Sequence, residues 1–291
     1  MGDMSTRTRV RARPLRPGGL RAPWPFQPGA VVGARFAIQE LLGRGGLALV
    51  YLAHDHELGR QVALKVLRAG PSLAEDQRER FLREARVGTR LRHPHVVPVH
   101  EAGIVAGWPF LALEPIDGPS LELVLLGERR LSARRTLALL APVAAALGYA
   151  HREGVVHRDV KPQNVLLSAG GVPFLADFGL ALDATDPRRI TAPGCSVGTP
   201  AYVAPEQRRG QTADARSDVY AFGVTLFECL TGALPRALEP SPPAAALARL
   251  AGDAPAPLRE LCLACLESEP AARPGDGQAL AEALRGLGPP A

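Results

Sequence analysis

The chain has 291 residues, of which 46% are hydrophobic and 22% are charged, and it contains four cysteines. This length and composition predict one large soluble domain or two lobes around a cleft, and they exclude a small disulfide scaffold and a largely disordered chain. The apolar stretch 136–150 has fifteen residues without a charged residue or histidine, and no such stretch in the chain exceeds sixteen, whereas a bilayer span takes about 20. We therefore expect no membrane span. The N-terminal residues show no apolar signal segment, so we also expect a cytoplasmic protein.

The formal net charge of +5 comes from residues 1–30, which hold six arginines and one acidic residue. This segment is rich in proline and glycine, so we expect a disordered basic tail. The rest of the chain is neutral overall. The charge therefore predicts no specific nucleic-acid partner, although weak contact of the tail with an acidic partner or an anionic surface stays open.

Residues 31–113 predict a strand-rich unit with one helix. Short apolar runs at 37–42, 48–53, 61–67 and 110–113 are separated by glycines or charged turns, as strands are. The helix is expected to begin with a capping box at 71–75. Phe81, Glu84, Gly88 and Leu91 then fall on one face of this helix, so Glu84 shares its face with apolar residues.

The turn-rich segment 114–119 is expected to be a hinge to a mainly helical unit at 120–289. Apolar periodicity predicts the helices of that unit. They are expected at 121–126, 132–151, 217–230, 244–251, 256–267 and 277–286.

The first candidate site is a glycine-rich turn between two predicted strands. It consists of Leu42, Gly43, Arg44, Gly45, Gly46, Leu47, Ala48, Leu49 and Val50. Glycines let backbone N–H groups approach phosphates with no Cβ in the way. A strand follows the turn and no Gly-Lys-Ser/Thr ends it, so it is neither a dinucleotide-binding fingerprint nor a P-loop. Taken alone, a plain hairpin is the simpler interpretation.

The second candidate is Lys65, at the end of a strand, with Glu84 nineteen residues later on an otherwise apolar helix face. A buried carboxylate without a partner is costly, so we expect Lys65 to pair with Glu84. Lys65 and Lys161 are the only lysines, and Asn164 is the only asparagine, in a chain rich in arginine. Positions that keep lysine are candidates for a compact point charge, although scarce residues also fall somewhere by chance.

Two further segments carry chemically active groups. HRDVKPQN begins at His157, and DFG begins at Asp177, thirteen residues after Asn164. The oxygens of Asn164 and Asp177 suit Mg²⁺, which also binds phosphates. Asp159 and Lys161, two residues apart on an extended loop, suit a proton acceptor and a group that neutralises phosphate charge.

In this order and spacing, the segments are similar to those of Hanks-type (eukaryotic-like) protein kinases, and the Leu-Gly-Arg-Gly-Gly loop is similar to the bacterial serine/threonine branch. The resemblance covers about 31–287. It implies an α+β bilobal fold, with a small antiparallel-sheet N-lobe that carries one regulatory helix and a larger helical C-lobe. It also implies a non-specific serine/threonine protein kinase that moves the γ-phosphoryl group of ATP to protein hydroxyls and autophosphorylates its activation loop.

The resemblance continues through Gly-Thr-Pro-Ala-Tyr-Val-Ala-Pro-Glu at 198–206, which looks like the P+1 loop and its Ala-Pro-Glu motif. Asp218 matches a C-lobe anchor of the family, and Arg273 is expected to pair with Glu206. Lys161 and the activation-segment residue Thr199 are similar to serine/threonine kinases and not to tyrosine kinases.

For the nucleotide, the resemblance implies that residues 42–50 cover ATP and that Lys65, held by Glu84, binds its α and β phosphates. Leu113 falls at the gatekeeper position. The adenine site would be formed by Ala63, Leu113, Glu114 and Ile116.

For the reaction, the resemblance implies that Asn164 and Asp177 hold two Mg²⁺ ions, with Mn²⁺ as an alternative. Asp159 would orient the substrate hydroxyl and accept its proton, and Lys161 would stabilise the transferring phosphoryl group. Because every charged catalytic position is present, a pseudokinase is disfavoured. Ala48 replaces the third glycine of the loop, and we expect this methyl group to weaken ATP affinity.

Arg158, beside the catalytic aspartate, indicates control by phosphorylation, because its guanidinium would lack a partner until a phosphate arrives. Thr191 and Ser196 are better candidate acceptors than Thr185, and we expect Thr191 to be the single main site. The resemblance also makes a homodimer for trans-autophosphorylation an option, with no residue-level support.

Three alternatives stay open: a scaffold that binds nucleotide without transfer, a small-molecule phosphotransferase, and a nucleic-acid binder that rests on the tail alone. The segment 198–206 disfavours the second, because it would position a peptide substrate. Cys262 and Cys265 have the spacing of half a zinc site, but no second pair accompanies them, so we expect helix packing.

Overall fold

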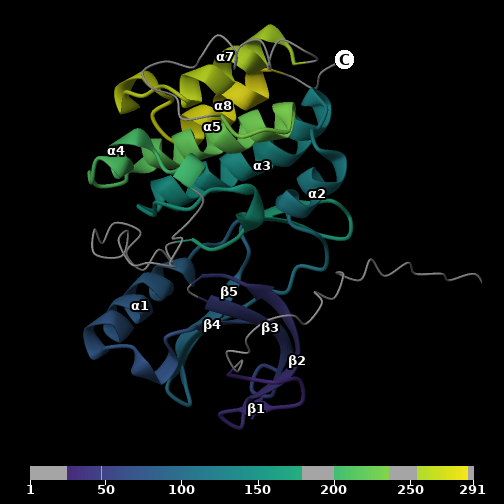
Figure 1. The fold of residues 1–291 in the computed structure, drawn as a ribbon, viewed down its shortest axis with the longest axis vertical. Coiled ribbons are helices and arrows are strands. Elements are labelled where there is room, and N and C mark those ends of the chain that lie inside the picture. The colour runs from purple at the N-terminus through teal and green to yellow at the C-terminus, as the bar shows by residue number, and fades with distance from the viewer. Residues whose placement is uncertain (1–24, 47, 179–199, 236–253, 288–291) are drawn as a thin grey trace, which may run out of the picture.

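The computed structural model describes residues 25–46, 48–178, 200–235 and 254–287, without the side chains of Glu84 and Pro200. It has two lobes, with strands in one and mostly helices in the other (Figure 1). The N-lobe holds a six-stranded antiparallel sheet in the order β1-β2-β3-β4-β6-β5. Its strands are β1 (Val31–Val32), β2 (Phe36–Arg44), β3 (Ala48–Asp55), β4 (Arg60–Leu67), β5 (Val99–Val105) and β6 (Trp108–Leu113).

Alternation along the strands gives the sheet two different faces. Residues opposite one another in an antiparallel pair share a face, and Tyr51 lies opposite Leu64 on the face that holds the apolar core of the N-lobe. Val50 lies opposite Lys65 on the other face. One residue of register therefore places Lys65 on the face that looks away from that core.

Helix α1 (Glu75–Gly88) lies beside the sheet (Figure 1). The expected capping box is wrong: Ser72 ends a separate 3₁₀ turn, and the N-cap is Ala74, which makes no side-chain cap. The cause is Pro71, the second residue of that short turn, after which Leu73 is extended. The acidic side chains in the first turn of α1 stabilise its N-terminus instead.

The link between the lobes runs from Leu113, where β6 ends, to Leu121, where α2 begins. It crosses the strand that ends at Leu167, whose N–H donates to the Pro119 carbonyl over 2.9 Å. A Cβ at Gly118 would overlap the Leu167 carbonyl oxygen. A glycine is therefore needed where the link passes over that strand.

The C-lobe packs around α3 and α5, most of whose residues are buried. Its helices are α2 (Leu121–Glu128), α3 (Ala133–Arg152), α4 (Pro205–Arg208), α5 (Ala215–Thr231), α7 (Ala256–Cys265) and α8 (Gly277–Gly286). The hairpin β7 (Val165–Leu167) and β8 (Pro173–Leu175) lies at the boundary between the lobes. Among the described residues there are also four 3₁₀ turns: Gly70–Ser72, Pro162–Asn164, Pro200–Tyr202 and Pro270–Ala272.

The helices predicted at 121–126, 132–151, 217–230, 256–267 and 277–286 are confirmed within a few residues. The one predicted at 244–251 lies outside the described residues. Cys262 and Cys265 are fully buried in the C-lobe core, so their predicted packing role is confirmed. Within the described part of the chain, no helix is long and apolar enough to cross a membrane.

Candidate active site

Lys65 and Asp177 form an ion pair between the lobes. Strand β4 carries Lys65, whose Nζ lies 2.7 Å from Asp177 Oδ1. Burial acts to raise the pKa of the Asp177 carboxyl, but the Lys65 ammonium outweighs it and holds that pKa below its usual value. Asp177 is therefore ionised at neutral pH. The expected partner of Lys65, the carboxylate of Glu84 on α1, lies outside the described side chains.

Asp159 is held from two sides. Lys161 Nζ lies 2.8 Å from Asp159 Oδ1 and 2.7 Å from Oδ2. Asn164 Nδ2 donates to Asp159 Oδ2 over 3.0 Å and to the Asp159 backbone carbonyl over 2.7 Å. The Asp159 side chain keeps 42% of its surface exposed, so a substrate can reach a carboxylate whose orientation is already fixed.

The same hydrogen bonds fix the amide of Asn164. Because Nδ2 makes both contacts with Asp159, Oδ1 of Asn164 is the atom left for a ligand. An amide oxygen and the ionised carboxylate of Asp177 are hard oxygen donors of the kind that Mg²⁺ prefers. The described residues contain no cluster of three or more histidine, cysteine, aspartate or glutamate side chains that could hold a metal ion.

His157 connects the loop of Asp159 to the segment of Asp177. The Asp159 N–H donates to His157 Nδ1 over 3.2 Å, and His157 Nε2 lies 2.8 Å from the Ala176 carbonyl oxygen. Since Nδ1 accepts, the ring is neutral and donates through Nε2. The ring also packs edge-on against Phe178, with centroids 4.6 Å apart. A single buried imidazole thus holds both halves of the site in register.

Asp218, at the start of α5, holds the beginning of the same loop. Its carboxylate accepts the N–H groups of His157 and Arg158, each over 2.7 Å. Arg158 has a positive φ of 69°, which residues other than glycine rarely adopt. The expected anchoring role of Asp218 therefore has a direct geometric basis.

The expected pair of Glu206 and Arg273 is present and buried. Two parallel hydrogen bonds of 2.8 Å join the guanidinium to the carboxylate. Burial acts to raise the pKa of Glu206, but hydrogen bonds from Arg273 and Ser217 hold it below its usual value. Arg273 also donates to the backbone carbonyls of Glu267, Arg216 and Ser268. The pair thus joins α4 to α5 and to the turn before α8.

The glycine-rich loop joins β2 to β3, which pair as an antiparallel hairpin. The Gly45 N–H donates to the Ala48 carbonyl over 2.8 Å, so the turn is tight. Ala48 is almost fully buried and lies on the same sheet face as Val50 and Lys65. Its methyl group therefore lies on the side expected to face ATP. Leu47, at the tip, is outside the described residues.

Apolar side chains from both lobes meet where adenine is expected. Ala63 lies opposite Leu113 across β4 and β6, and Ile116 packs in the same apolar cluster. The backbone N–H of Glu114 donates to the Pro98 carbonyl over 2.9 Å, which turns this peptide toward β5. Sequence reasoning missed Leu166, on β7, which joins this cluster from the C-lobe. In the sequence, Leu166 is marked only by its place in the short apolar run between Val165 and Leu167.

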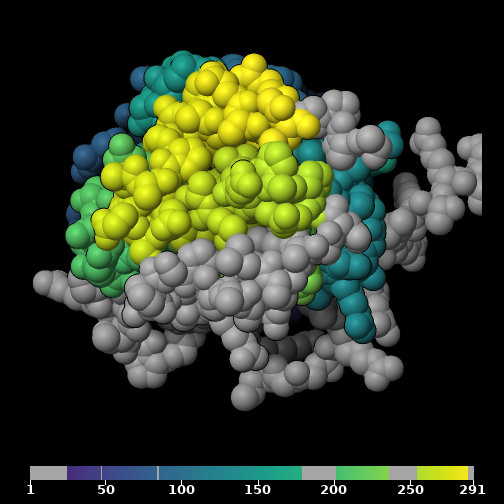
Figure 2. All heavy atoms as spheres, turned by 90° about the horizontal axis from the view of Figure 1, so that it is seen from above, coloured from purple at the N-terminus to yellow at the C-terminus, as the bar shows by residue number. Residues whose placement is uncertain are grey.

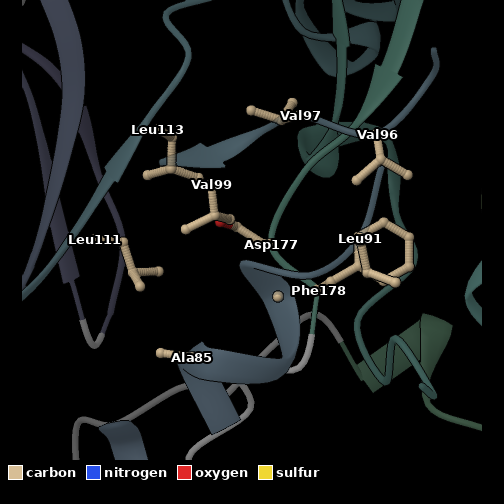
Figure 3. A pocket seen from close by; sticks show the side chains of 10 residues that line it. Ala85, Leu91, Val96, Val97, Val99, Leu111, Leu113, Asp177 and Phe178 are labelled. Atoms are coloured by element: carbon tan, nitrogen blue, oxygen red, sulfur yellow. The ribbon is translucent and has the colours of Figure 1, made fainter. Parts of the chain in front are cut away.

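A small apolar cavity lies behind Leu113, between α1 and the segment of Asp177 (Figure 3). Leu111 and Leu113 border it from β6, Ala85 from α1, and Phe178 from the opposite side. Its volume of about 10 Å³ has room for about one water molecule. Asp177 also borders this cavity, whose other lining residues are apolar or glycine.

The activation-segment residues Thr191, Ser196 and Thr199 lie outside the described residues. Arg158 is exposed, and its guanidinium forms no ion pair within the described ranges. The expectation that a phosphate would pair with Arg158 therefore stays a prediction.

Comparison with known proteins places these features in a family. A family model described as protein kinase domain matches residues 36–284. The chain is 44% identical over 214 residues to the DNA damage-responsive serine/threonine-protein kinase RqkA of Deinococcus radiodurans, a match that covers 72% of this chain and 32% of the relative. It is 43% identical over 209 residues to the serine/threonine-protein kinase PknD of Mycobacterium tuberculosis, covering 70% and 31% of the two chains. The chain thus spans about a third of the length of the curated relatives it matches.

The fold is also similar to solved structures. The kinase domain of Mycobacterium tuberculosis PknI superposes with a TM-score of 0.73 at 32% identity, over 90% of this chain and 99% of that one. The expected bilobal α+β fold is therefore confirmed, with its small antiparallel sheet and its larger helical lobe.

Proposed function

Because the chain belongs to the protein kinase family, we propose that it transfers the γ-phosphoryl group of ATP to serine and threonine hydroxyls of proteins. The observation that carries this proposal is the carboxylate of Asp159, which Lys161 and Asn164 hold in place while it stays partly exposed. Lys161 is near enough to Asp177 for its charge to help lower the pKa of that carboxyl. The catalytic loop and the Lys65–Asp177 pair therefore act on one site.

Each group has a role that its surroundings support. Asp159 orients the attacking hydroxyl and accepts its proton, because its carboxylate is held and accessible. Lys161 supplies positive charge next to the reacting oxygens, and Lys65 does so for the α and β phosphates. Phosphoryl transfer depends mainly on positioning and electrostatics, so these three charges account for most of what the protein must supply.

Members of the family use ATP with a divalent metal ion, and we propose Mg²⁺ as that ion, held by Asn164 Oδ1 and the Asp177 carboxylate. A bound divalent ion neutralises charge on the phosphate oxygens. The protein contributes ligand orientation: Asp159 fixes the amide of Asn164, and Lys65 fixes the carboxylate of Asp177. Mn²⁺ has a similar preference for oxygen ligands and is the natural comparison in an assay.

The test is incubation of the purified chain with a general protein substrate and ATP labelled at the γ phosphate, beside ATP labelled at the α phosphate. We expect γ label on serine and threonine in the presence of Mg²⁺, and no label from α-labelled ATP. EDTA should abolish incorporation, and the Asp159→Asn variant should lower its rate by at least about 10²-fold. Nucleotide binding without γ transfer under all metal conditions would overturn the proposal and favour a scaffold.

We also propose Thr191 as the main autophosphorylation site, with Arg158 as the partner of the phosphate. Thr191→Ala should lower incorporation into the chain and its activity on substrate, whereas the matched Thr185→Ala should change neither by much. Mass spectrometry locates the phosphates. Full autophosphorylation by Thr191→Ala would refute this assignment. A rate per molecule that rises with protein concentration would show that one copy phosphorylates another.

A further inference from the structure

The segment before β1 docks against the N-lobe. Residues 25–35 precede the part of the chain that matches the protein kinase domain. Two hydrogen bonds with Ile38 of β2 hold this segment: the Gly29 N–H donates to the Ile38 carbonyl over 2.8 Å, and the Ile38 N–H donates to the Ala30 carbonyl over 2.9 Å. Phe26 packs against the apolar cluster of the N-lobe. The segment is therefore joined to the sheet by its backbone and by a side chain.

The Phe26 ring contacts two aromatic side chains of the sheet. Its centroid lies 5.2 Å from that of Trp108, with the ring planes at 66°, and 5.9 Å from that of Tyr51 on β3. Edge-on contacts of this kind are a favourable arrangement of aromatic rings. Trp108 is the first residue of β6 and is only partly buried. Phe26 therefore restricts the orientations that the Trp108 ring can take.

The Trp108 ring also packs on the turn that leads into α1. Gly70 begins this 3₁₀ turn with a φ of 52°. A Cβ on Gly70 would lie 2.5 to 2.7 Å from three atoms of the Trp108 ring, so the indole lies directly on this glycine. A Cβ on Gly107, the residue before Trp108, would lie 3.3 Å from two side-chain atoms of Pro71. The start of β6 and the turn before α1 therefore fit closely against each other.

Helix α1 is tied to the same turn. The Arg78 guanidinium, in the first turn of α1, donates to the carbonyls of Pro71 and Leu73, each over 3.3 Å. Leu73 is buried in the same apolar cluster as Phe81 of α1. A displacement of the turn would therefore move the start of α1 with it.

The other end of α1 packs on the segment of Asp177. Ala85 and Gly88 line the same small cavity as Asp177 and Phe178 (Figure 3). A Cβ on Gly88 would lie 3.8 Å from the Phe178 carbonyl oxygen, which is an ordinary contact distance. Packed side chains and hydrogen bonds thus connect the N-terminal segment to Asp177 without a gap.

We propose that Phe26 and Trp108 are positioning residues for phosphoryl transfer, through which the N-terminal segment fixes α1 and, through α1, the Asp177 carboxylate. This inference rests on the proposed kinase function, and it gives residues 25–35 a role in the reaction. Phe26 packs on the sheet face opposite the one that carries Lys65. Because it lies away from the expected nucleotide, its loss should change kcat more than KM for ATP.

The first test compares two neighbouring substitutions in the full chain. Phe26→Ser removes the ring, whereas Gln27→Ser changes an exposed side chain next to it. We expect Phe26→Ser to lower kcat by about 3- to 10-fold, with KM for ATP changed less than about twofold. Gln27→Ser should change neither. Phe26→Tyr keeps the ring and should retain most of the wild-type kcat.

Two glycines with the same backbone requirement test the contact with the turn. Gly70 and Gly59 have φ values of 52° and 64°, so alanine strains the backbone at both. Only at Gly70 does the new methyl group meet Trp108, whereas at Gly59 it meets no atom within 4 Å. Gly70→Ala should lower kcat, and Gly59→Ala should not. In a chain with Trp108→Leu, adding Phe26→Ser should lower kcat no further, because both act through one contact.

A control for stability comes from α8, which lies on the outer surface of the C-lobe (Figure 2). Leu284 of this helix is buried in the core of the C-lobe. Leu284→Ala should lower the unfolding midpoint at least as much as Phe26→Ser, because it leaves a cavity. It should leave the kcat of the folded chain unchanged, since α1 belongs to the other lobe. If the two variants lose kcat in proportion to their unfolded fractions, the role of Phe26 is only structural.

Tryptophan fluorescence reports the first contact without any activity. Trp24 and Trp108 are the only tryptophans of the chain. In a chain with Trp24→Phe, the emission therefore comes from Trp108 alone. Adding Phe26→Ser should raise the quenching of this emission by acrylamide, because the indole loses a neighbouring ring. Adding Gln27→Ser should not.

Hydrogen exchange reports the start of α1 in the same way. The Arg78 N–H donates to the Ala74 carbonyl over 3.0 Å, and its exchange should be faster in Phe26→Ser than in Gln27→Ser. If the wild type transfers no phosphate, the proposed function fails, while quenching and exchange still decide whether Phe26 holds Trp108 and α1. Equal quenching or equal exchange in the two variants, or equal kcat in an active chain, would overturn the proposal.

Discussion

The ion pairs that we propose act on the nucleotide differ from the ion pair that anchors the C-lobe in two ways: how deeply the side chains are buried, and how many of their hydrogen-bonding groups are already in use. In the Lys65–Asp177 pair the side chains are 16% and 28% exposed, and Asp159 is 42% exposed. In the Glu206–Arg273 pair they are 5% and 0% exposed. Lys65, Asp177 and Asp159 therefore keep hydrogen-bonding groups that a ligand can reach. Glu206 and Arg273 use nearly all of theirs within the protein.

This difference predicts which property each pair controls. Arg273 has five hydrogen bonds to the carboxylate and to three carbonyls, so its loss leaves several buried groups without a partner. Lys65 has one described ion pair at the edge of a cleft. Substitutions at the anchor should therefore change stability first, and substitutions at the cleft should change the rate first.

The largest expected effect on stability comes from Arg273→Met. Removing one partner of a buried ion pair typically costs about 3–5 kcal/mol, because the other charge stays buried. The matched control is Arg285→Met, whose partner Glu282 lies 4.0 Å away with both side chains more than half exposed. The control should cost less than about 1 kcal/mol. Urea unfolding measures both, and equal losses would break the distinction between anchor and surface pair.

Lys65→Met tests the cleft side of the comparison. Removing the ammonium takes away charge near the phosphates, and we expect kcat to fall about 10²- to 10³-fold. The free energy of unfolding should change much less than in Arg273→Met. Lys65→Arg is the conservative control and should recover little activity, because a planar guanidinium does not replace a compact point charge. Steady-state kinetics and unfolding on the same samples would contradict this if activity and stability fell together.

A smaller effect is expected from pH. The pKa of Glu206 is held below its usual value in the folded state, so its ionised form stabilises the fold above about pH 4.5. That stabilisation is lost as the pH falls through the folded-state pKa. Arg273→Met removes the main cause of the lowered pKa, so the gap in unfolding free energy between wild type and variant should narrow below pH 4.5. A gap that stays constant from pH 7 to pH 3 would contradict it.

The smallest expected effect is at Ala48, whose single methyl group is expected to affect both the affinity for ATP and the stability of the fold. Ala48→Gly should lower KM for ATP less than about tenfold, which corresponds to under about 1.4 kcal/mol. It should also destabilise the fold by about 1 kcal/mol, since glycine in a strand loses more entropy and a buried methyl group is removed. An unchanged dependence on ATP would refute the effect on affinity.

The helices of the C-lobe could be predicted because apolar periodicity and capping side chains are visible within a few residues of sequence. Ser132 and Asp276 cap α3 and α8 through hydrogen bonds to the N–H groups three residues later. Strand β5 was missed, since a bulge between Val99 and Glu101 interrupts its alternation. The strands of the β7–β8 hairpin have three residues each, too few to show a period.

The candidate site was predictable as a set of residues but not as a set of contacts. Nothing in the sequence near Lys65 or Asp177 shows that their side chains meet, because the lobes must fold before the distance between them is defined. The same holds for Phe26, whose ring contacts Trp108 on a strand far along the chain. Leu166 joins the apolar cluster for a similar reason: the hairpin presents it to the other lobe.

We expect the Asp159 carboxylate to carry phosphoryl transfer and to contribute little to the stability of the fold. Asp159→Asn tests it most directly, with kcat, affinity for ATP in Mg²⁺ and the unfolding midpoint measured on one preparation. We expect a kcat lower by about 10²- to 10⁴-fold, with affinity for ATP and unfolding midpoint close to wild type. A kcat near wild type, or a loss of transfer that follows loss of binding or of folding, would contradict it.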